Sequence, residues 1–186
     1  MTSQISTNGV NAEVLGSFMG NMKSNPDMAT VTFSVKTAWE RTGFKVISTG
    51  KDFLVGGQQM QRDNGFTLQS DFPKQMGGMG EGPTVCETCM ASIATCLTQT
   101  MVAYATMMGV QLDRVEVNTE GDADLRGFTG ISENVRPGAQ EFRIKVHLES
   151  NTAAKDQLEK LYEMGRKFSP AMDTITHGTV IKTSLV

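Results

Sequence analysis

The feature that constrains the fold most is a run of 25 residues, Thr88 to Leu112, that contains no Asp, Glu, Lys or Arg. A helix of this length could cross a membrane. However, hydroxyl and amide side chains interrupt its apolar surface, and the basic residues that usually flank a membrane span are missing. A helix without a charged face is otherwise buried in a protein core or in a subunit interface. The run therefore predicts a long buried helix, and we expect no association with a membrane.

The bulk properties of the chain are those of a folded protein without a nucleic-acid partner. Of its 186 residues, 39% are hydrophobic and 20% are charged, and the net charge is −3. Lys and Arg are scattered rather than clustered, so no nucleic acid is expected as a partner. Residues 1–13 contain neither the basic nor the apolar segment of a secretory signal. We therefore expect one domain over residues 1–186, located in the cytoplasm, where cysteines stay reduced.

Short strand patterns surround the long helix on both sides. The strongest is a strict alternation of apolar and polar residues from Phe142 to Leu148, which predicts a half-buried strand. Further helices are expected at Val10–Ser24, at Thr152–Lys167 and from Pro170 onward. Further strands are expected at 29–35, 44–48, 53–55, 66–69, 112–117 and 178–185. This mixture, without an internal repeat, predicts the α+β class.

The chain has three cysteines, and all three lie near the start of the long helix. On an α-helix Cys86, Cys89 and Cys96 fall within roughly 80° of arc, so they share one face. Zinc is the first hypothesis for such a cluster, but Cys86 and Cys96 would be about 15 Å apart along the axis, too far for one ion. His147 lies on the exposed phase of its strand. We therefore expect no metal site, and no motif indicates a cofactor.

Cys86 and Cys89 form a C-x-x-C pair at the start of the helix, which leaves two interpretations open. A helix N-terminus favours the thiolate form, as in thioredoxin-like redox motifs. Those motifs normally follow a strand, however, whereas a Gly-rich loop precedes this one. The alternative is that both cysteines are small hydrophobic residues of the core, which is common for cysteine.

Cys96 ends a longer motif. Residues 82–96 read GPTVCETCMASIATC. They resemble, without a gap, the pattern G-P-x-P-x-E-L-L-L-A-A-L-x-x-C of the OsmC/Ohr family of hydroperoxide-resistance proteins. Further matches follow in that family's order, at Gly121-Asp122 with Leu125–Gly127, at Val135–Gly138 and at Phe168–Thr174. The first expected helix resembles the extra N-terminal helix of one branch, so the resemblance extends over nearly the whole chain.

The resemblance implies an OsmC-like fold, in which antiparallel sheets pack around a long central buried helix in an intertwined homodimer. It also implies a function, the reduction of organic hydroperoxides with a thiol as reductant. Cys96 would be the peroxidatic thiolate and Glu87 a carboxylate facing the active site. An arginine from the turn between the first two strands would complete the site, and Arg41 occupies such a turn. A guanidinium would stabilise the thiolate, and the carboxylate would hold the guanidinium in place.

The chain departs from the family pattern at two positions. Val85 stands in place of the second proline. Ser169 stands where two-cysteine members have their resolving cysteine, so the usual disulfide with Cys96 cannot form. We expect Ser169 to cap the last helix by accepting a backbone N–H near Met172. The loss of the resolving cysteine leaves an alternative function open, a non-catalytic OsmC-like protein that binds a small apolar ligand. A reactive Cys96 would favour the enzyme, and an inert thiol would favour the binding protein.

Overall fold

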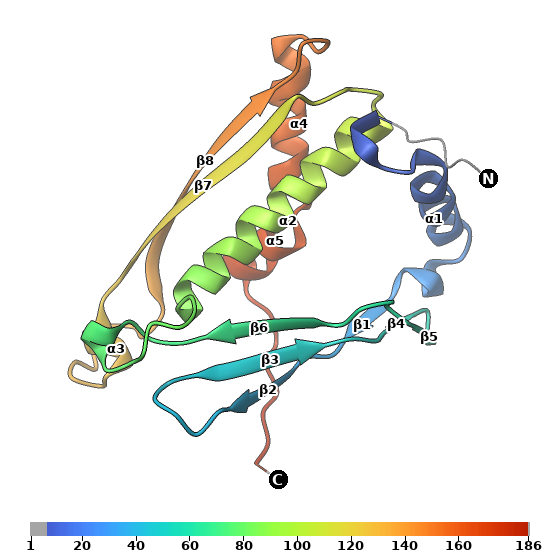
Figure 1. Ribbon diagram of the computed structural model, residues 1–186. Helices are drawn as coiled ribbons and strands as arrows, with labels where there is room; N and C mark the ends of the chain where they lie inside the picture. Colours follow the sequence, from blue (N-terminus) through green and yellow to red (C-terminus); the bar gives the residue numbers. More distant parts are fainter. Residues whose placement is uncertain (1–6, 186) are drawn as a thin grey trace. The chain divides into compact units, whose positions relative to one another are not determined.

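The computed structural model describes residues 7–185 (Figure 1). Its α-helices are α1 (Ala12–Ser24), α2 (Val85–Met107), α3 (Leu125–Phe128), α4 (Lys155–Phe168) and α5 (Pro170–His177). Its strands are β1 (Val31–Phe33), β2 (Lys36–Trp39), β3 (Val46–Gly50), β4 (Phe53–Val55), β5 (Gln58–Met60), β6 (Phe66–Ser70), β7 (Arg114–Ala123) and β8 (Ala139–Glu149). Short 3-10 turns lie at Thr7–Gly9, Pro26–Ala29 and Lys74–Met76. Residues 1–6, which contribute to the expectation of a cytoplasmic protein, lie outside the described residues.

The chain divides into two compact units. The first combines Met1–Ala12 with Cys89–Val186 and holds most of α2, so we call it the helical unit. The second, Glu13–Thr88, holds the first six strands, and we call it the sheet unit. That the whole chain folds as one domain stays a prediction.

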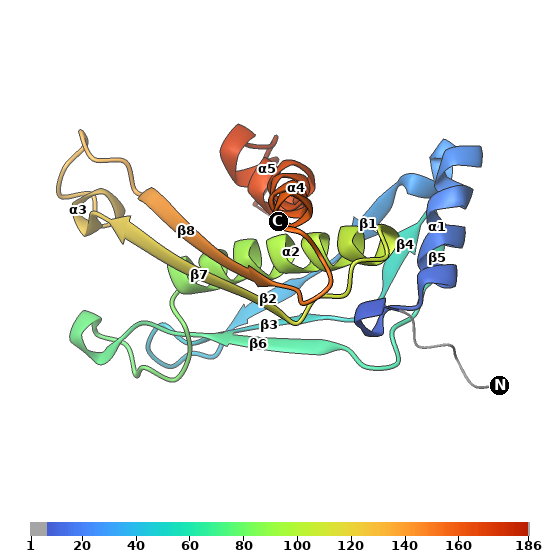
Figure 2. The same ribbon diagram turned by 90° about the horizontal axis from the view of Figure 1, so that it is seen from above.

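The core of the helical unit lies between α2 and α4. Spacing by four residues places Ile93, Leu97, Met101 and Ala105 on one stripe of α2, and all four are buried. Helix α4 contributes Leu161, which is fully buried, and it lies beside α2 (Figures 1 and 2). The contact is so close that a Cβ atom on Gly165 of α4 would lie 2.4 Å from Met101 Cγ. Glycine is therefore the residue that lets the two helices approach here.

Strands β7 and β8 form a long antiparallel ribbon in the same unit (Figure 1). On one face Val117 lies opposite Val146, and Val115 lies opposite Leu148. On the other face charged side chains pair across the ribbon, including Arg143 with Asp122. Because successive residues of a strand point to opposite faces, the alternating sequence produces this two-sided ribbon. The predicted strand at 142–148 is confirmed as the central part of β8.

The sheet unit consists of two small antiparallel sheets with strand orders β1-β4-β5 and β2-β3-β6. Of its residues, all of which the structure describes, only Val55 and Asp71 are buried. Large apolar side chains are exposed instead, including Phe33 at 64% and Trp39 at 61%. Single-chain packing therefore leaves much of the apolar surface of these sheets uncovered.

Some of the other predicted helices and strands are confirmed, and others are not. The long helix is confirmed, but it starts three residues earlier than the uncharged run, and it ends before Gly109, which adopts a left-handed φ of 69°. Strands β2 and β5 were not predicted. The prediction of a strand at 178–185 is wrong. These residues have no regular structure and pair with no strand among the described residues. A strand needs a hydrogen-bonded neighbour, which a sequence pattern alone does not supply.

Candidate functional site

Cys96 lies in the middle of α2 and is half-buried. Its sulfur accepts a hydrogen bond from the backbone N–H of Ala171 in α5, with 3.4 Å between nitrogen and sulfur. The sulfur is therefore in contact with an element that lies 75 residues further along the chain.

The packing of α4 explains why α5 begins at this sulfur. Gly165 fixes the close approach of α4 to α2 beside Leu97 and Met101, within five residues of Cys96. Helix α4 ends at Phe168, and α5 starts at Pro170. Proline carries no N–H, so Ala171 offers the first backbone donor of α5. The first N–H groups of a helix lack partners within the helix, and the Cys96 sulfur accepts one of them.

Ser169 occupies the cap position of α5 but does not act as the predicted cap. Its side chain makes no capping hydrogen bond, although its carbonyl oxygen accepts the N–H of Asp173 at 3.0 Å. The residue is fully buried, and its hydroxyl oxygen has no hydrogen-bond partner among residues 7–185. The Cys96 sulfur thus takes the N–H of Ala171 that a capping hydroxyl would normally accept.

The first turn of α5 presents its N–H donor to the sulfur. The N-terminus of a helix carries partial positive charge, and an N–H donor stabilises a thiolate more than a thiol. Cys96 itself lies in mid-helix, where the dipole of α2 contributes little. The helix end that contacts the sulfur is therefore that of α5 and not that of α2.

Glu87 lies in the first turn of α2, in the sheet unit. Its carboxylate accepts the N–H of Thr84 at 2.7 Å and the Thr84 hydroxyl at 2.8 Å, while that hydroxyl oxygen accepts the N–H of Glu87 at 3.2 Å. These reciprocal bonds form a capping box. The backbone N–H and then the hydroxyl of Thr84 lower the pKa of Glu87. The T-x-x-E spacing could have revealed this role in the sequence, where we interpreted Glu87 only as an active-site carboxylate.

Arg41 lies in the turn between β2 and β3, at the kind of position where the active-site arginine was predicted. Its backbone has a φ of 61°, a left-handed conformation that is uncommon outside glycine. The side chain is exposed, and it forms no ion pair, with Glu87 or any other residue, in the described part of the chain. The predicted pairing of Arg41 with Glu87 is thus not formed in the single chain.

Of the other two cysteines, only Cys86 differs from Cys96 in exposure. Cys86 is exposed, Cys89 is half-buried like Cys96, and no disulfide joins any of the three. Cys96 follows Cys89 by seven positions on the helix, which is about 10 Å along the axis and too far for a disulfide. Among the residues that the structure describes, no three or more His, Cys, Asp or Glu side chains are grouped as metal ligands. No helix within residues 7–185 is long and apolar enough to span a membrane.

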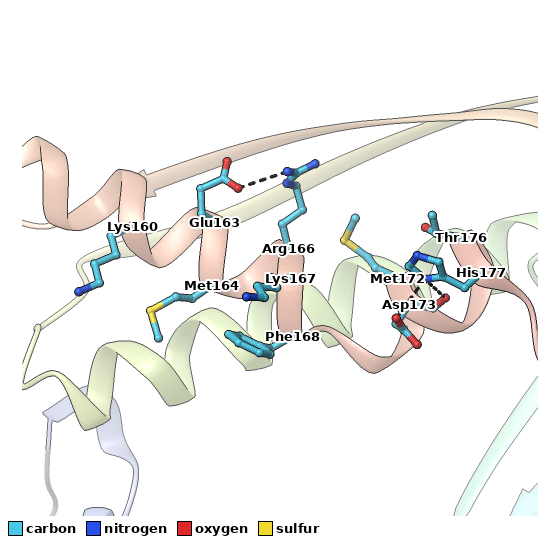
Figure 3. Close-up of a pocket in the computed structure, with 10 residues that line it drawn as sticks. All are labelled: Lys160, Glu163, Met164, Arg166, Lys167, Phe168, Met172, Asp173, Thr176 and His177. Carbon is cyan, nitrogen blue, oxygen red and sulfur yellow. Dashed lines mark hydrogen bonds and ion pairs between the residues drawn. The ribbon is translucent and has the colours of Figure 1, made fainter.

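A groove of about 530 Å³ lies along the C-terminal half of α4 and α5 (Figure 3). Met164, Phe168 and Met172 contribute apolar surface to it. Charged side chains also line it, Arg166 pairs with Glu163 at 3.3 Å, and a ring nitrogen of His177 lies 3.0 Å from a carboxylate oxygen of Asp173. Cys96 is not one of its lining residues. The groove could hold a small molecule that has both apolar and charged parts.

Comparison with known proteins identifies related sequences and folds. A family model described as OsmC-like protein matches residues 78–184. No curated protein sequence matches the chain significantly.

Several solved structures share the fold. An OsmC-like protein from Mycoplasma pneumoniae has a TM-score of 0.56 at 14% identity, covering 78% of this chain and 87% of that one. An OsmC-like protein of unknown function from Vibrio cholerae has a TM-score of 0.52 at 11% identity, covering 76% of this chain and 92% of that one. At such low identity these likenesses establish the fold alone, and they confirm the predicted α+β class with antiparallel sheets.

Proposed function

The chain belongs to the OsmC-like protein family, and on this premise we propose that it reduces organic hydroperoxides with Cys96 as the reactive thiol. One observation carries the proposal, the hydrogen bond from the Ala171 N–H to the Cys96 sulfur at the start of α5. It places a hydrogen-bond donor against the sulfur, and a thiolate, the form of cysteine that attacks a peroxide, accepts such a bond more strongly than a thiol does. The motif that ends at Cys96 supports the same assignment from the sequence side.

The reaction begins when the thiolate attacks one oxygen of the hydroperoxide. A sulfur–oxygen bond forms and the oxygen–oxygen bond breaks, so the sulfur loses two electrons. The other oxygen leaves with the organic group, takes a proton from solvent and becomes an alcohol. Cys96 is left as a sulfenic acid, the first step of cysteine oxidation.

Roles for Glu87 and Arg41 at the reactive thiol remain hypotheses that rest on the family resemblance. The carboxylate of Glu87 caps α2 through Thr84, and Arg41 is exposed in its turn. A chemical role for Glu87 would go beyond this cap. Thr84→Ala and Glu87→Ala both disrupt the capping box, so their effects on Cys96 reactivity separate the two roles. The comparison is valid when both variants have lost the same free energy of unfolding. If Glu87 then takes part in the chemistry, Glu87→Ala slows the oxidation of Cys96 and Thr84→Ala does not.

The direct test is the consumption of cumene hydroperoxide in the presence of dithiothreitol. We expect Cys96→Ser to abolish turnover, while Cys86→Ser and Cys89→Ser, which leave the site at α5 intact, retain most of it. Circular dichroism checks that each variant is folded. Unchanged turnover in folded Cys96→Ser would refute the proposal.

The groove of Figure 3 favours a second candidate function, the binding of a small ligand without catalysis. Its apolar side chains and its charged side chains match a molecule with an apolar body and a polar end. If Cys96 is unreactive, this candidate remains. Protection of α4 and α5 from hydrogen exchange by such a ligand would then support it.

A further inference from the structure

The buried hydroxyl of Ser169 has no place in the resting site. Burial removes it from water, and no group within residues 7–185 replaces that interaction. A buried polar group without a partner destabilises a fold, so alanine at this position would be the better residue for stability alone. The hydroxyl is therefore available to donate to a group that arises at the site during a reaction.

The geometry of α5 indicates where that group would lie. A side-chain oxygen at the cap position lies near the N–H groups of the first turn, because it normally accepts one of them. Here the Ala171 N–H, two residues after Ser169, donates to the Cys96 sulfur instead. The hydroxyl of Ser169 and the sulfur of Cys96 thus lie at the same end of the same helix.

We propose that Ser169 holds the oxidised form of Cys96, its buried hydroxyl donating a hydrogen bond to the sulfenate oxygen, until an external small thiol reduces it. This inference rests on the proposed function, and it adds the role of Ser169 and the class of the reductant. The chain has only three cysteines, and neither Cys86 nor Cys89 can reach Cys96 along one helix. No thiol of the same chain can therefore resolve the sulfenate as these helices stand.

The complete cycle balances with two molecules of external thiol. The first attacks the sulfur of the sulfenic acid, forming a mixed disulfide, and the oxygen leaves as water. The second attacks the mixed disulfide, releases the Cys96 thiol and leaves as the disulfide of the small thiol. In sum, one hydroperoxide and two thiols give one alcohol, one water and one disulfide.

The test follows the mass of Cys96 after one equivalent of cumene hydroperoxide and then an excess. In the wild type we expect one added oxygen that persists and is trapped by dimedone, and mercaptoethanol should convert it to a mixed disulfide. In Ser169→Ala the excess should add the second oxygen about tenfold faster, because a hydrogen bond to an anion is worth at least that factor in rate. Ser169→Thr, which keeps the hydroxyl, should restore the slow rate. Ser92→Ala, which removes an exposed hydroxyl of α2, is the matched control and should leave it unchanged.

A second variant tests the proximity of the two side chains without relying on rates. Ser169→Cys places a thiol at the buried cap position, and hydroperoxide should then produce a disulfide with Cys96 and no added oxygen. Equal rates of further oxidation in the wild type and Ser169→Ala would overturn the inference, as would the absence of that disulfide.

The outcomes separate this inference from the proposed function. If cumene hydroperoxide oxidises wild-type Cys96 but Ser169→Ala behaves like the wild type, the proposed function stands and the role of Ser169 is refuted. If cumene hydroperoxide does not oxidise Cys96, the proposed function fails. An excess of hydrogen peroxide can still generate the sulfenate in that case, and comparing its further oxidation in the same variants decides the role of Ser169.

Discussion

The helical unit and the sheet unit differ in how much apolar surface each buries within one chain. In the helical unit, Leu97, Met101 and Leu161 are at most 1% exposed, and the contact at Gly165 is as close as a glycine allows. In the sheet unit, Phe33 and Trp39 are more than half exposed, although both lie on regular strands. Regular secondary structure is thus present in both units, but a tightly packed core only in the first.

The difference matters for the site, because the contact between Cys96 and Ala171 lies entirely in the helical unit. This unit can position the Cys96 sulfur with its own residues. We expect the exposed apolar side chains of the sheet unit to be covered, since monomeric proteins rarely expose large contiguous apolar patches. A second copy of the chain is the cover that the family resemblance predicts.

The largest expected effect is the loss of core packing in the helical unit. Leu161→Ala should lower the free energy of unfolding by about 2–5 kcal/mol, because the fully buried side chain leaves a cavity between α2 and α4. Leu54→Ala on the partly exposed strand β4 is the control and should cost clearly less. Urea denaturation followed by circular dichroism measures both. Equal losses in the free energy of unfolding would contradict the difference in packing between the two units.

The second effect tests whether a second copy of the chain covers the exposed apolar side chains of the sheet unit. If a second copy covers the sheets, light scattering should give twice the mass of one chain at micromolar concentration, with an interface above the ~2,000 Å² typical of permanent dimers. Phe33→Ala should then cost about 3 kcal/mol, the value for a buried phenylalanine, instead of the ~0.5 kcal/mol of a surface position. A monomeric mass together with a negligible cost would show that these faces remain in water.

The third effect uses the same substitution in the two units. Gly165→Ala should destabilise the protein by about 1–3 kcal/mol, because the new Cβ would overlap Met101. Gly20→Ala in α1, where a Cβ would meet nothing within 4 Å, should stabilise the helix by up to ~1 kcal/mol. Thermal unfolding of both variants shows whether each substitution stabilises or destabilises the protein. Stabilisation by Gly165→Ala would mean that α4 and α2 are less tightly packed than described.

The smallest effect is the pH dependence of the sheet unit. Burial of Asp71 tends to raise its pKa, but hydrogen bonds from the backbone N–H groups of Glu81, Phe72 and Met79 outweigh burial and lower it. A lowered pKa stabilises the fold above the unfolded value of about 4, and this contribution is lost as the pH falls through the folded value.

Trp39 is the only tryptophan, so its fluorescence reports on the sheet unit. The stability difference between the wild type and Asp71→Asn should shrink between pH 5 and pH 3, because protonation removes the same charge in the wild type. A difference that does not depend on pH would show that the carboxylate charge does not hold the loop from Phe72 to Glu81.

The fold could be predicted where side-chain periodicity reflects burial inside the chain. The alternation at 142–148 and the uncharged run at 88–112 correspond to β8 and α2, because one face of α2 is buried and one face of β8 is half-buried. The pattern at 178–185 is equally strand-like, but its strand needs a hydrogen-bonding partner that the single chain does not provide. The predicted homodimer and cytoplasmic location stay predictions.

The site could be predicted only in part, because the motif locates Cys96 but not what surrounds it. The contact with Ala171 depends on Gly165, four residues before Ser169, which permits the close helix packing. No local pattern in the sequence indicates that packing. The cap at Ser169 was predicted from a valid local rule, and tertiary structure overrode it when the Cys96 sulfur accepted the Ala171 N–H.

The central claim is that Cys96, rather than the C-x-x-C pair, is the reactive sulfur. The most direct measurement is peptide mass spectrometry of all three thiols over a time course with cumene hydroperoxide. We expect Cys96 to gain one oxygen before Cys86 or Cys89 changes, although Cys86 is the most exposed of the three. If Cys96 stays unmodified while Cys86 and Cys89 oxidise together, the redox centre is the pair at the start of α2, and Cys96 is not the reactive sulfur.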